Sequence, residues 1–397
     1  MLTLIRRCYG HSSLGRALAV VALSGASFLA LSHEQAWADE GRAGAARGAV
    51  IVNSAEGLSR ALGRASNGAV IKLAPGDYPE INLSGYNFSG TVTITSAQPD
   101  HPARIFKMVV QKTSGLTFRD LNLNAQQGSM SVLPFRFEKS SRLTLDHVLV
   151  HGPDDQASAF DIPGLMIRDG QDVTLSNSRF TRLLHAVQVL DIKRFRAIGN
   201  EFWNVRSDGI RGGGITDALY AYNICTDFHP VVPDHPDCIQ LWSTNQSEPG
   251  RNIVIRDNLF VRGNGAPIQG IFVRDTFAKL PFENIEISGN LMIGTLYNSM
   301  TIDGVQGAKI IGNEAIALNG QQTWIRLERA HHVDLHDNIA PKLMLLTEDS
   351  DIQDRNNRFN ENGHQAYRAR LMQWLEAKPE RRRKDSVVLS KLLDAAR

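Results

Sequence analysis

A repeating pattern of apolar and polar positions runs through the middle of the chain. Each copy has two apolar residues separated by one position, then two further positions, an asparagine, one more position and another apolar residue. Looser copies precede these at residues 116–123, 143–150 and 173–180. A period near 23 residues with insertions predicts one turn of a parallel β-coil per copy. The asparagines are spaced 23, 35, 32, 23 and 25 residues apart and are Asn200, Asn223, Asn258, Asn290, Asn313 and Asn338.

A second short apolar segment follows each of these asparagines. The segments are rich in Ile and Val, alternate with period two and are interrupted by Gly and Asn, which favours strands over helical repeats. In such a coil, equivalent asparagines are expected to hydrogen-bond to one another. Alignment of the second strands places His185, Asp208, Asp237 and Gln269 in one column at the strand entrances. The outer face is then expected to carry Gln188, Arg211, Gln240, Phe272 and Arg326.

The pattern predicts an all-β fold, a single-stranded right-handed parallel β-helix with an N-terminal capping helix and C-terminal helices. The β-helix is expected over residues 81–360, after a linker and cap at 39–80. An amphipathic helix near residues 54–66 fits the cap, because the end of a coil exposes strand edges that need cover. The basic segment 361–397 is predicted to be helical and to cover the other end or lie along the side.

Residues 1–38 have the features of a secretory signal. A basic stretch precedes an apolar run that ends in small residues, and cleavage is expected after Ala38. An uncleaved anchor is the alternative, although the apolar run is shorter than the ~20 residues that usually span a bilayer. The sequence therefore predicts a secreted or periplasmic protein with no stable membrane insertion, and we expect a monomer.

Charge excludes one class of partner. The whole chain has a net charge of +2, but its positive excess lies in the first 38 residues and in the tail, so the body between them carries a net negative charge. Nucleic-acid binding through bulk charge is therefore not expected, and an acidic substrate needs locally placed cations.

The opening of the predicted coil resembles a known group of proteins. Residues 57–85, GLSRALGRASNGAVIKLAPGDYPEINLSG, and residues 91–99, TVTITSAQP, look like the start of β-helix polysaccharide lyases of the alginate and chondroitin type. Over roughly residues 50–360 the chain resembles the pectate-lyase-like superfamily. The resemblance implies the fold and a polysaccharide ligand, but the superfamily also holds hydrolases, uronate epimerases and non-catalytic proteins. The catalytic lysine–arginine motif and metal-binding glutamates of those lyases have no recognisable counterpart here.

An insertion between two predicted strands gathers candidate chemistry. The segment TDFHPVVPDHPDCIQLW, residues 226–242, holds His229, Asp234, His235 and Asp237. Neighbouring turns lie ~4.8 Å apart, so Asp208 of the preceding turn is expected beside Asp237. Two such acids repel each other, and one tends to hold a proton unless a cation intervenes.

For a uronate-containing polysaccharide, these residues favour a lyase. Arg211 or Arg274 would pair with the sugar carboxylate, and His235 would abstract the C5 proton, with Asp208 and Asp237 completing the acid/base set. No cofactor is required for this chemistry. The remaining candidates for contacts with substrate are Gln240, Trp242, His229, Gln188 and Asp303.

Several alternatives stay open at this point. A uronate C5-epimerase shares the proton abstraction, a glycoside hydrolase would use Asp208 and Asp237 as its carboxylate pair, and a non-catalytic β-helix would only bind polysaccharide. Trp203 and Trp324 could stack on sugars or pack internally, and Arg326 with Glu328 reads as a surface ion pair. The metal alternatives are Ca²⁺ held by Asp208, Asp234 and Asp237, or zinc held by His229, His235 and Asp237.

Two cysteines bracket the insertion. Cys8 lies in the signal segment, which leaves Cys225 and Cys238 for the exported chain. A disulfide between them would restrict the loop and stabilise the fold by roughly 3 kcal/mol. Alternatively, Cys225 points into an apolar column and cannot reach Cys238.

Overall fold

The computed structural model describes residues 49–126, 133–153, 161–318, 320–346, 351–359, 367–377 and 386–396. All of them belong to one compact unit, Ala46–Arg397. The expected signal segment lies outside the described residues.

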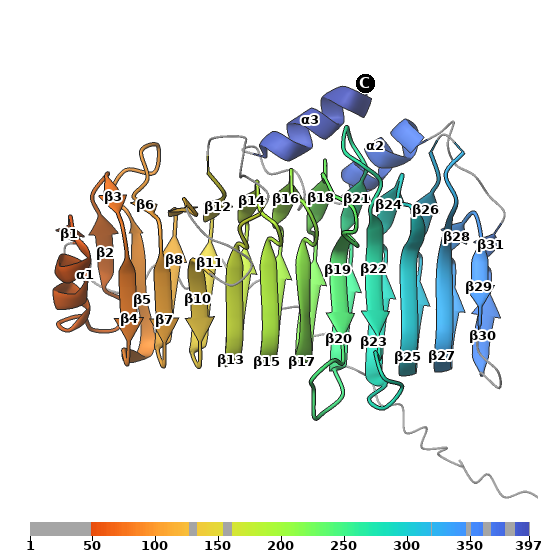
Figure 1. Cartoon of the computed structure of the whole chain (residues 1–397), viewed down its shortest axis with the longest axis horizontal. Coiled ribbons are helices and arrows are strands. Elements are labelled where there is room, and N and C mark those ends of the chain that lie inside the picture. Colours follow the sequence, from red (N-terminus) through yellow and green to blue (C-terminus); the bar gives the residue numbers. More distant parts are fainter. Residues whose placement is uncertain are drawn as a thin grey trace, which may run out of the picture. The chain divides into compact units, whose positions relative to one another are not determined.

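The strands form two parallel sheets that wind around a common core, with successive strands side by side (Figure 1). Sheet B has twelve strands: β3 (Asp77–Tyr78), β6 (Arg104–Ile105), β9 (Asn122–Asn124), β12 (Leu149–His151), β14 (Arg179–Thr181), β16 (Glu201–Trp203), β18 (Ile224–Thr226), β21 (Leu259–Val261), β24 (Leu291–Ile293), β26 (Glu314–Ile316), β28 (Ile339–Ala340) and β31 (Arg358–Phe359). Sheet A has nineteen: β1 (Val50–Val52), β2 (Val70–Leu73), β4 (Ile81–Ser84), β5 (Asn87–Ser96), β7 (Met108–Gln111), β8 (Ser114–Arg119), β10 (Phe135–Glu138), β11 (Ser141–Asp146), β13 (Leu165–Ser176), β15 (Val187–Ile198), β17 (Ile210–Ala221), β19 (Asp237–Trp242), β20 (Arg251–Arg256), β22 (Gln269–Arg274), β23 (Phe282–Ser288), β25 (Tyr297–Ile311), β27 (Thr323–His336), β29 (Leu343–Leu345) and β30 (Ile352–Arg355).

Sheet A is folded into two faces because its long strands bend. The bends fall on residues with left-handed backbone angles, for example Asp191 (φ 55°), Gly214 (φ 68°) and Gly304 (φ 85°), a conformation that Gly, Asp and Asn tolerate best. We call the first of these faces the site face. It consists of β4, β7, β10, β19, β22 and β29 with the first segments of β13, β15, β17, β25 and β27. The predicted parallel β-helix is confirmed, and its right-handed sense stays a prediction.

Inward side chains stack from turn to turn in columns. One buried column of the site face contains a residue that the sequence alignment omitted. This residue is Met300, which lies between Ile271 and Ile325. The expected alignment passed from Ile271 to Ile325 and took no inward residue from the strand predicted at 299–303, where the structure has a register shift between Asn298 and Met300. From β13 to β27 the column is Leu165, Val187, Ile210, Ile239, Ile271, Met300 and Ile325.

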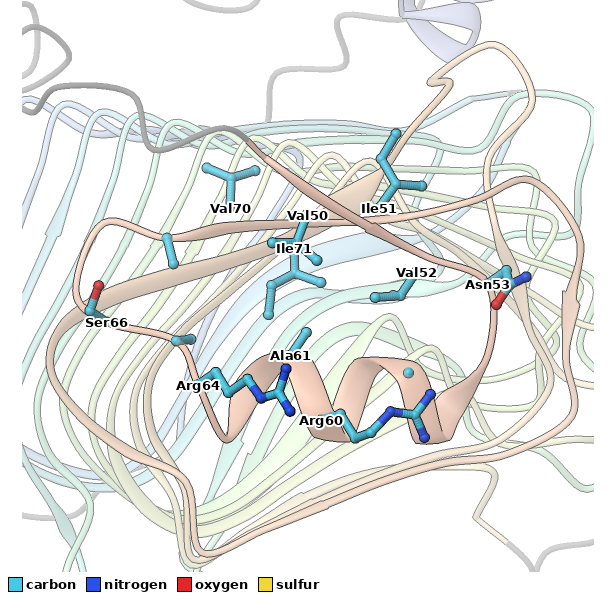
Figure 2. A pocket seen from close by; sticks show the side chains of 13 residues that line it. Val50, Ile51, Val52, Asn53, Arg60, Ala61, Arg64, Ser66, Val70 and Ile71 are labelled. Atoms are coloured by element: carbon cyan, nitrogen blue, oxygen red, sulfur yellow. The ribbon is translucent and has the colours of Figure 1, made fainter.

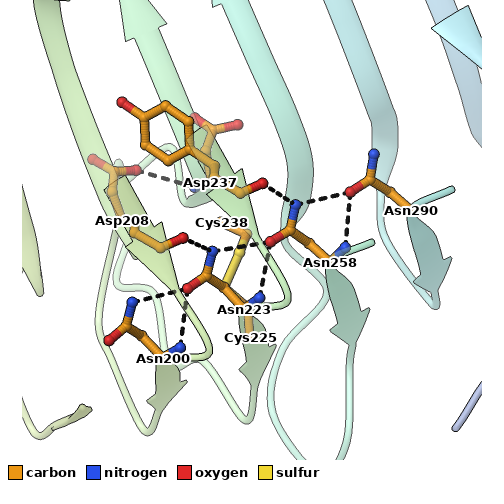
Figure 3. Close-up of a disulfide and its surroundings, with 10 residues drawn as sticks. Asn200, Asp208, Asn223, Cys225, Asp237, Cys238, Asn258 and Asn290 are labelled. Atoms are coloured by element: carbon orange, nitrogen blue, oxygen red, sulfur yellow. Dashed lines mark hydrogen bonds between the residues drawn. A yellow bond between two sulfur atoms is a disulfide. The ribbon is translucent and has the colours of Figure 1, made fainter. Parts of the chain in front are cut away.

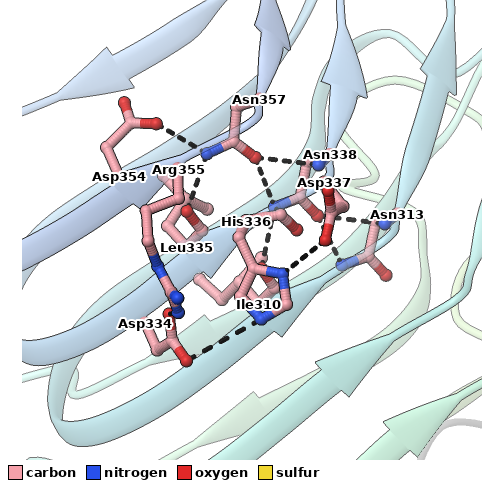
Figure 4. A network of polar contacts seen from close by, with 10 residues as sticks. All are labelled: Ile310, Asn313, Asp334, Leu335, His336, Asp337, Asn338, Asp354, Arg355 and Asn357. Carbon is pink, nitrogen blue, oxygen red and sulfur yellow. Dashed lines mark hydrogen bonds and ion pairs between the residues drawn. The ribbon is translucent and has the colours of Figure 1, made fainter.

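The expected asparagine ladder is present and extends one rung further than predicted, to Asn357 (Figures 3 and 4). Each side-chain oxygen accepts from the backbone and side-chain nitrogens of the preceding rung; at Asn258 these distances are 2.9 and 3.0 Å. Each side-chain nitrogen also donates to a carbonyl, Tyr220 O in the case of Asn258. The residue before each rung is left-handed, such as Gly199 (φ 70°), which turns the chain by a single residue. We call Asn200, Asn223, Asn258, Asn290, Asn313, Asn338 and Asn357 the asparagine ladder.

The first turn carries the predicted capping helix, α1 (Ala55–Leu62). The Ser54 hydroxyl accepts from Gly57 N at 3.0 Å, and Leu58 and Leu62 are buried against the coil. Strands β1, β2 and β3, from the segment expected as a cap, already pair within the two sheets. Beside α1, the outermost strand β1 leaves Ile51 exposed over a surface hollow of about 430 Å³ (Figure 2).

The C-terminal helices α2 (Tyr367–Ala377) and α3 (Val387–Ala396) lie along the side of the coil, against sheet B (Figure 1). Leu371, Leu375 and Leu392 pack with Leu259 and Leu291. The Arg370 guanidinium pairs with Glu314, and the Ser386 hydroxyl donates to buried Glu201. Of the two placements expected for this tail, the structure selects the second. No helix in the described ranges has the length and apolar character needed to cross a membrane.

Candidate functional site

The column predicted at the strand entrances is confirmed. Ala186 N donates to Asp208 O at 2.9 Å, and Gly209 N donates to Asp237 O at 3.0 Å, which sets His185, Asp208 and Asp237 on successive turns. Asp237 is then level with Gln269. Asn298 and Trp324 continue the stack. The Asn298 side chain donates to Gln269, and Asn298 is level with Trp324 in the strand register. We call His185, Asp208, Asp237, Gln269, Asn298 and Trp324 the entrance column.

Asp208 is the centre of one half of the site. Its Oδ2 accepts from Arg211 Nη1 at 2.9 Å and lies 3.3 Å from His185 Nδ1. The same Arg211 nitrogen is 2.9 Å from His185 Nε2. Asp208 Oδ1 accepts from Asp237 N at 3.0 Å, so this carboxylate ties two turns together. The cation that the sequence required beside the acids is therefore Arg211.

Asp237 is the centre of the other half. Its side chain is fully buried, and Oδ2 accepts from His235 Nδ1 at 3.1 Å and from Gln240 Nε2 at 2.9 Å. Oδ1 is buried without a hydrogen-bond partner among the described residues. Burial raises the pKa of this carboxyl to about 7; the contact with His235 opposes the rise and the negative Asp208 adds to it.

His235 is the most accessible titratable group of the pair. Its side chain is 53% exposed, and its Nε2 lies 2.6 Å from Gln269 Nε2. The edge of the imidazole meets the Phe272 ring with centroids 5.3 Å apart. The hydrogen bond to Asp237 raises the pKa of His235 above its usual value, against desolvation. His235 also lines a hollow of about 320 Å³ together with Gln269, Tyr297 and the prolines of the insertion.

The insertion that presents His235 is fixed at several points. Cys225 and Cys238 form a disulfide with Cα atoms 6.0 Å apart, next to the asparagine ladder (Figure 3). Asp234 Oδ2 accepts from Val231 N at 2.9 Å and from Arg206 Nε at 2.7 Å. These contacts hold a proline-rich segment whose own backbone forms few strand hydrogen bonds. Asp234 is thus a loop anchor, and His229 of the same insertion is exposed.

Two outward columns flank the entrance column on the site face. The first contains Gln188, Arg211, Gln240, Phe272, Thr301 and Arg326; Thr301 belongs to the turn that the sequence alignment skipped. The second contains Gly213, Trp242, Arg274, Asp303 and Glu328.

Trp242 supports Arg211 from the neighbouring turn. The Arg211 guanidinium lies 4.9 Å from the centroid of the Trp242 ring, a cation–π distance. Gly213 makes this possible, because a Cβ there would be 2.7 Å from Trp242 O and 3.0 Å from Trp242 Nε1. Trp242, expected as a substrate contact, therefore also positions the arginine.

The remaining expected residues lie apart from this cluster. Arg274 is level with Trp242 and its Nε is 3.3 Å from Asp303 Oδ2, while Arg329 Nε donates to Asp303 Oδ1 at 2.8 Å. Arg326 and Glu328 form the ion pair expected from sequence. Trp203 packs under α3, with Lys391 Nζ 5.7 Å from its ring. Gln188 lies one turn before Arg211 in the first outward column.

Within the described ranges, no group of three or more His, Cys, Asp or Glu side chains is arranged to hold a metal ion. Asp208 pairs with Arg211 and Asp234 pairs with Arg206. The structure therefore brings together neither the set expected for Ca²⁺ nor the set expected for zinc.

Sequence reasoning gave no role to His185, Gln269 or Asn298. The repeat alignment did place His185 and Gln269 in the right column, so position was available as a signal. Their partners were not, because the pattern does not reveal that Asn298 Nδ2 reaches Gln269 Oε1 at 2.6 Å on the neighbouring turn.

No family model and no curated protein matches the chain. Solved structures are similar to it in fold. A mannuronic-acid-specific polysaccharide family 6 lyase from human gut microbiota is 13% identical, with a TM-score of 0.53 over 78% of this chain and 82% of that one. PfbA, a surface adhesin of Streptococcus pneumoniae, is 12% identical, with a TM-score of 0.50 over 80% of this chain and 92% of that one. The expected resemblance to the pectate-lyase-like superfamily is confirmed at the level of fold.

Proposed function

We propose that the protein acts on an acidic polysaccharide lying along the site face, and that it is a lyase that cleaves a uronate-containing chain by β-elimination. The observation that carries this proposal is the His235–Asp237 pair, a half-exposed imidazole hydrogen-bonded to a fully buried carboxylate. A buried acid with a raised pKa beside an accessible histidine is typical of an acid/base site.

In the proposed reaction, His235 takes the C5 proton of a uronate. The electron pair forms the C4–C5 double bond, the C4–O bond breaks, and the leaving oxygen takes up a proton. Arg211 and Gln240, neighbours in the first outward column, bind the sugar carboxylate and stabilise the negative charge that grows on it. Arg274, half-exposed in the second outward column, is available to a neighbouring sugar.

Burial disfavours a hydrolase based on Asp208 and Asp237. Their side chains are 2% and 0% exposed, whereas the acid, base or nucleophile of a glycosidase has to contact the glycosidic oxygen, a water or the anomeric carbon. In the proposal both aspartates are positioning residues, Asp237 for His235 and Asp208 for Arg211.

The proposal includes export from the cytoplasm. The buried disulfide between Cys225 and Cys238 is typical of an oxidising compartment, and the basic and apolar segments within residues 1–38 have the order of a secretory signal. The similar lyase is specific for mannuronic acid according to its description, which makes alginates the first substrates to test.

The test is incubation with an alginate, a pectate and a glycosaminoglycan, followed by near-ultraviolet absorbance, reducing ends and uronate composition. Unsaturated products are expected, with at least a ~10²-fold lower rate for His235→Ala. His332→Ala is the matched control, because His332 also contacts a carboxylate, Asp351, but lies on the second face of sheet A.

Other outcomes identify the alternatives. Reducing ends without unsaturation mean hydrolysis, and a changed uronate composition at constant length means epimerisation. Binding without any product means a non-catalytic β-helix. Full activity of His235→Ala would remove this residue as the base.

A further inference from the structure

Four side chains from three successive turns and the insertion form a continuous chain of hydrogen bonds. Trp324 Nε1 lies 2.8 Å from Asn298 Oδ1, and Asn298 Nδ2 lies 2.6 Å from Gln269 Oε1. Gln269 Nε2 lies 2.6 Å from His235 Nε2. The chain therefore joins an indole three turns along the entrance column to the imidazole of the candidate base.

The chain has only one possible direction. An indole N–H donates and never accepts, so Asn298 has to turn its oxygen toward Trp324 and its nitrogen toward Gln269. Gln269 must then accept with Oε1 and donate with Nε2. The nitrogen of His235 that faces Gln269 is consequently an acceptor, and the proton of the neutral imidazole is on Nδ1, facing Asp237 Oδ2 at 3.1 Å.

We propose that Gln269, Asn298 and Trp324 form a directional relay that fixes the Nδ1–H tautomer of His235, and that Trp324 is a positioning residue acting through it. A proton on His235 Nε2 would require both amides to turn over. Asn298 would then direct an N–H toward the Trp324 N–H, leaving two donors face to face. The relay thus keeps the lone pair on Nε2, and Gln269 has to release its hydrogen bond to that lone pair before His235 takes a proton there.

The charged groups around His235 favour its protonated form and so oppose the relay. Asp237 faces it from β19 and Asp208 lies one turn further away, both favouring the protonated form. From β22 it meets only the amide of Gln269 and the ring of Phe272, and on the insertion Asp234 is engaged by Arg206. At the far end of the relay, Lys342 Nζ lies 6.0 Å from the centroid of the Trp324 ring. The protonation of His235 therefore reflects a balance between the two aspartates and the relay.

Long-range ¹H–¹⁵N NMR of the ¹⁵N-labelled protein tests this inference without any substrate. The wild-type spectrum is expected to show His235 protonated on Nδ1. Trp324→Phe keeps a ring against Tyr297, whose centroid is 5.3 Å away, but removes the donor. We expect the pKa of His235 to rise by about one unit, since the two amides can then turn over. The matched control, Trp203→Phe beneath α3, is expected to leave it unchanged.

Asn298→Asp provides a second variant that reverses the relay. A carboxylate only accepts, so Gln269 would donate to it and present Oε1 to His235, and the Nε2–H form should predominate. A wild-type signal from Nε2–H, or an unchanged His235 tautomer and pKa in both folded variants, would overturn the relay. Only its catalytic consequence rests on the proposed function, so a correct tautomer in a protein without lyase activity would contradict the function and leave the relay standing.

Discussion

The asparagine ladder and the entrance column are both stacks of polar side chains that rise with the same coil, and they differ in how their hydrogen bonds are satisfied. In the ladder every rung is the same residue, so each amide oxygen and nitrogen finds an equivalent partner on the next turn. The entrance column is mixed, with a histidine, two aspartates, two amides and an indole on its successive turns. At the same spacing between turns, identical side chains satisfy one another's hydrogen bonds, whereas different side chains bring groups of different acidity into contact.

The contrast is clearest at the two sides of the disulfide. Asn223 in the ladder has both its side-chain atoms paired, whereas Asp237 at the next strand entrance keeps one buried oxygen unpaired within the described part of the chain. Cys225 and Cys238 link the two stacks covalently. The ladder therefore serves as a rigid support, against which a carboxylate with a raised pKa is held.

Breaking an interior rung of the ladder should have the largest effect. Asn258→Ala leaves the buried backbone and side-chain donors of Asn223 without their acceptor and takes one of two donors from Asn290 Oδ1, so the free energy of unfolding should fall by about 3–5 kcal/mol in urea denaturation. The terminal rung is the control: Asn357→Ala, at a partly exposed position, should lower it by about 1 kcal/mol. Equal losses at both rungs would contradict the view of the ladder as a buried seam.

Removing the disulfide that links the two stacks should have the second-largest effect on stability. The double substitution Cys225→Ala and Cys238→Ala should lower the free energy of unfolding by about 3 kcal/mol, because it frees a loop of 13 residues in the unfolded chain. Wild-type protein treated with a reductant should show the same loss in denaturant titrations. A variant that still responds to the reductant would indicate that the effect arises elsewhere.

The entrance column should make stability depend on pH. Because the folded-state pKa of Asp237 is raised, the folded protein binds more protons than the unfolded chain between about pH 4 and 7, and stability falls as the pH rises through this window. The raised pKa of His235 acts in the same direction, since its contribution is lost as the pH rises through the folded-state value.

Asp237→Asn should flatten that dependence by about 3 kcal/mol between the two ends of the window. The measurement is the free energy of unfolding at a series of pH values for both proteins. Asn258→Ala, which changes no titratable group, should shift the whole curve downward and keep its slope. An unchanged slope in Asp237→Asn would show that this carboxyl does not titrate in the window.

The smallest effect on stability is expected from breaking the partly exposed ion pair of the site face. Arg326 and Glu328 are each about one third exposed, and ion pairs of this kind contribute less than about 0.5 kcal/mol. Arg326→Ala should therefore leave the denaturation midpoint almost unchanged. A loss as large as that of the disulfide variant would mean that polar groups on this face stabilise the fold much as the ladder does.

The sequence by itself determined the coil, its asparagine ladder and the strand-entrance register. All three follow from a period that repeats along the chain, and a repeated pattern is readable without tertiary contacts. It also located His235, Asp237, Asp208 and Arg211 in one region, because turns adjacent in sequence are adjacent in space.

Only the tertiary structure decided which groups meet and which are buried. Whether Asp208 is bound by Arg211 or by a metal, and whether Arg274 joins the cluster or pairs with Asp303, depends on side-chain directions. The extra ladder rung, the turn at Met300 and the relay to Trp324 depend on a register shift and on contacts between different turns. Periodicity specifies the level of each residue on the coil, whereas hydrogen-bond directions and solvent exclusion arise only when the turns pack together.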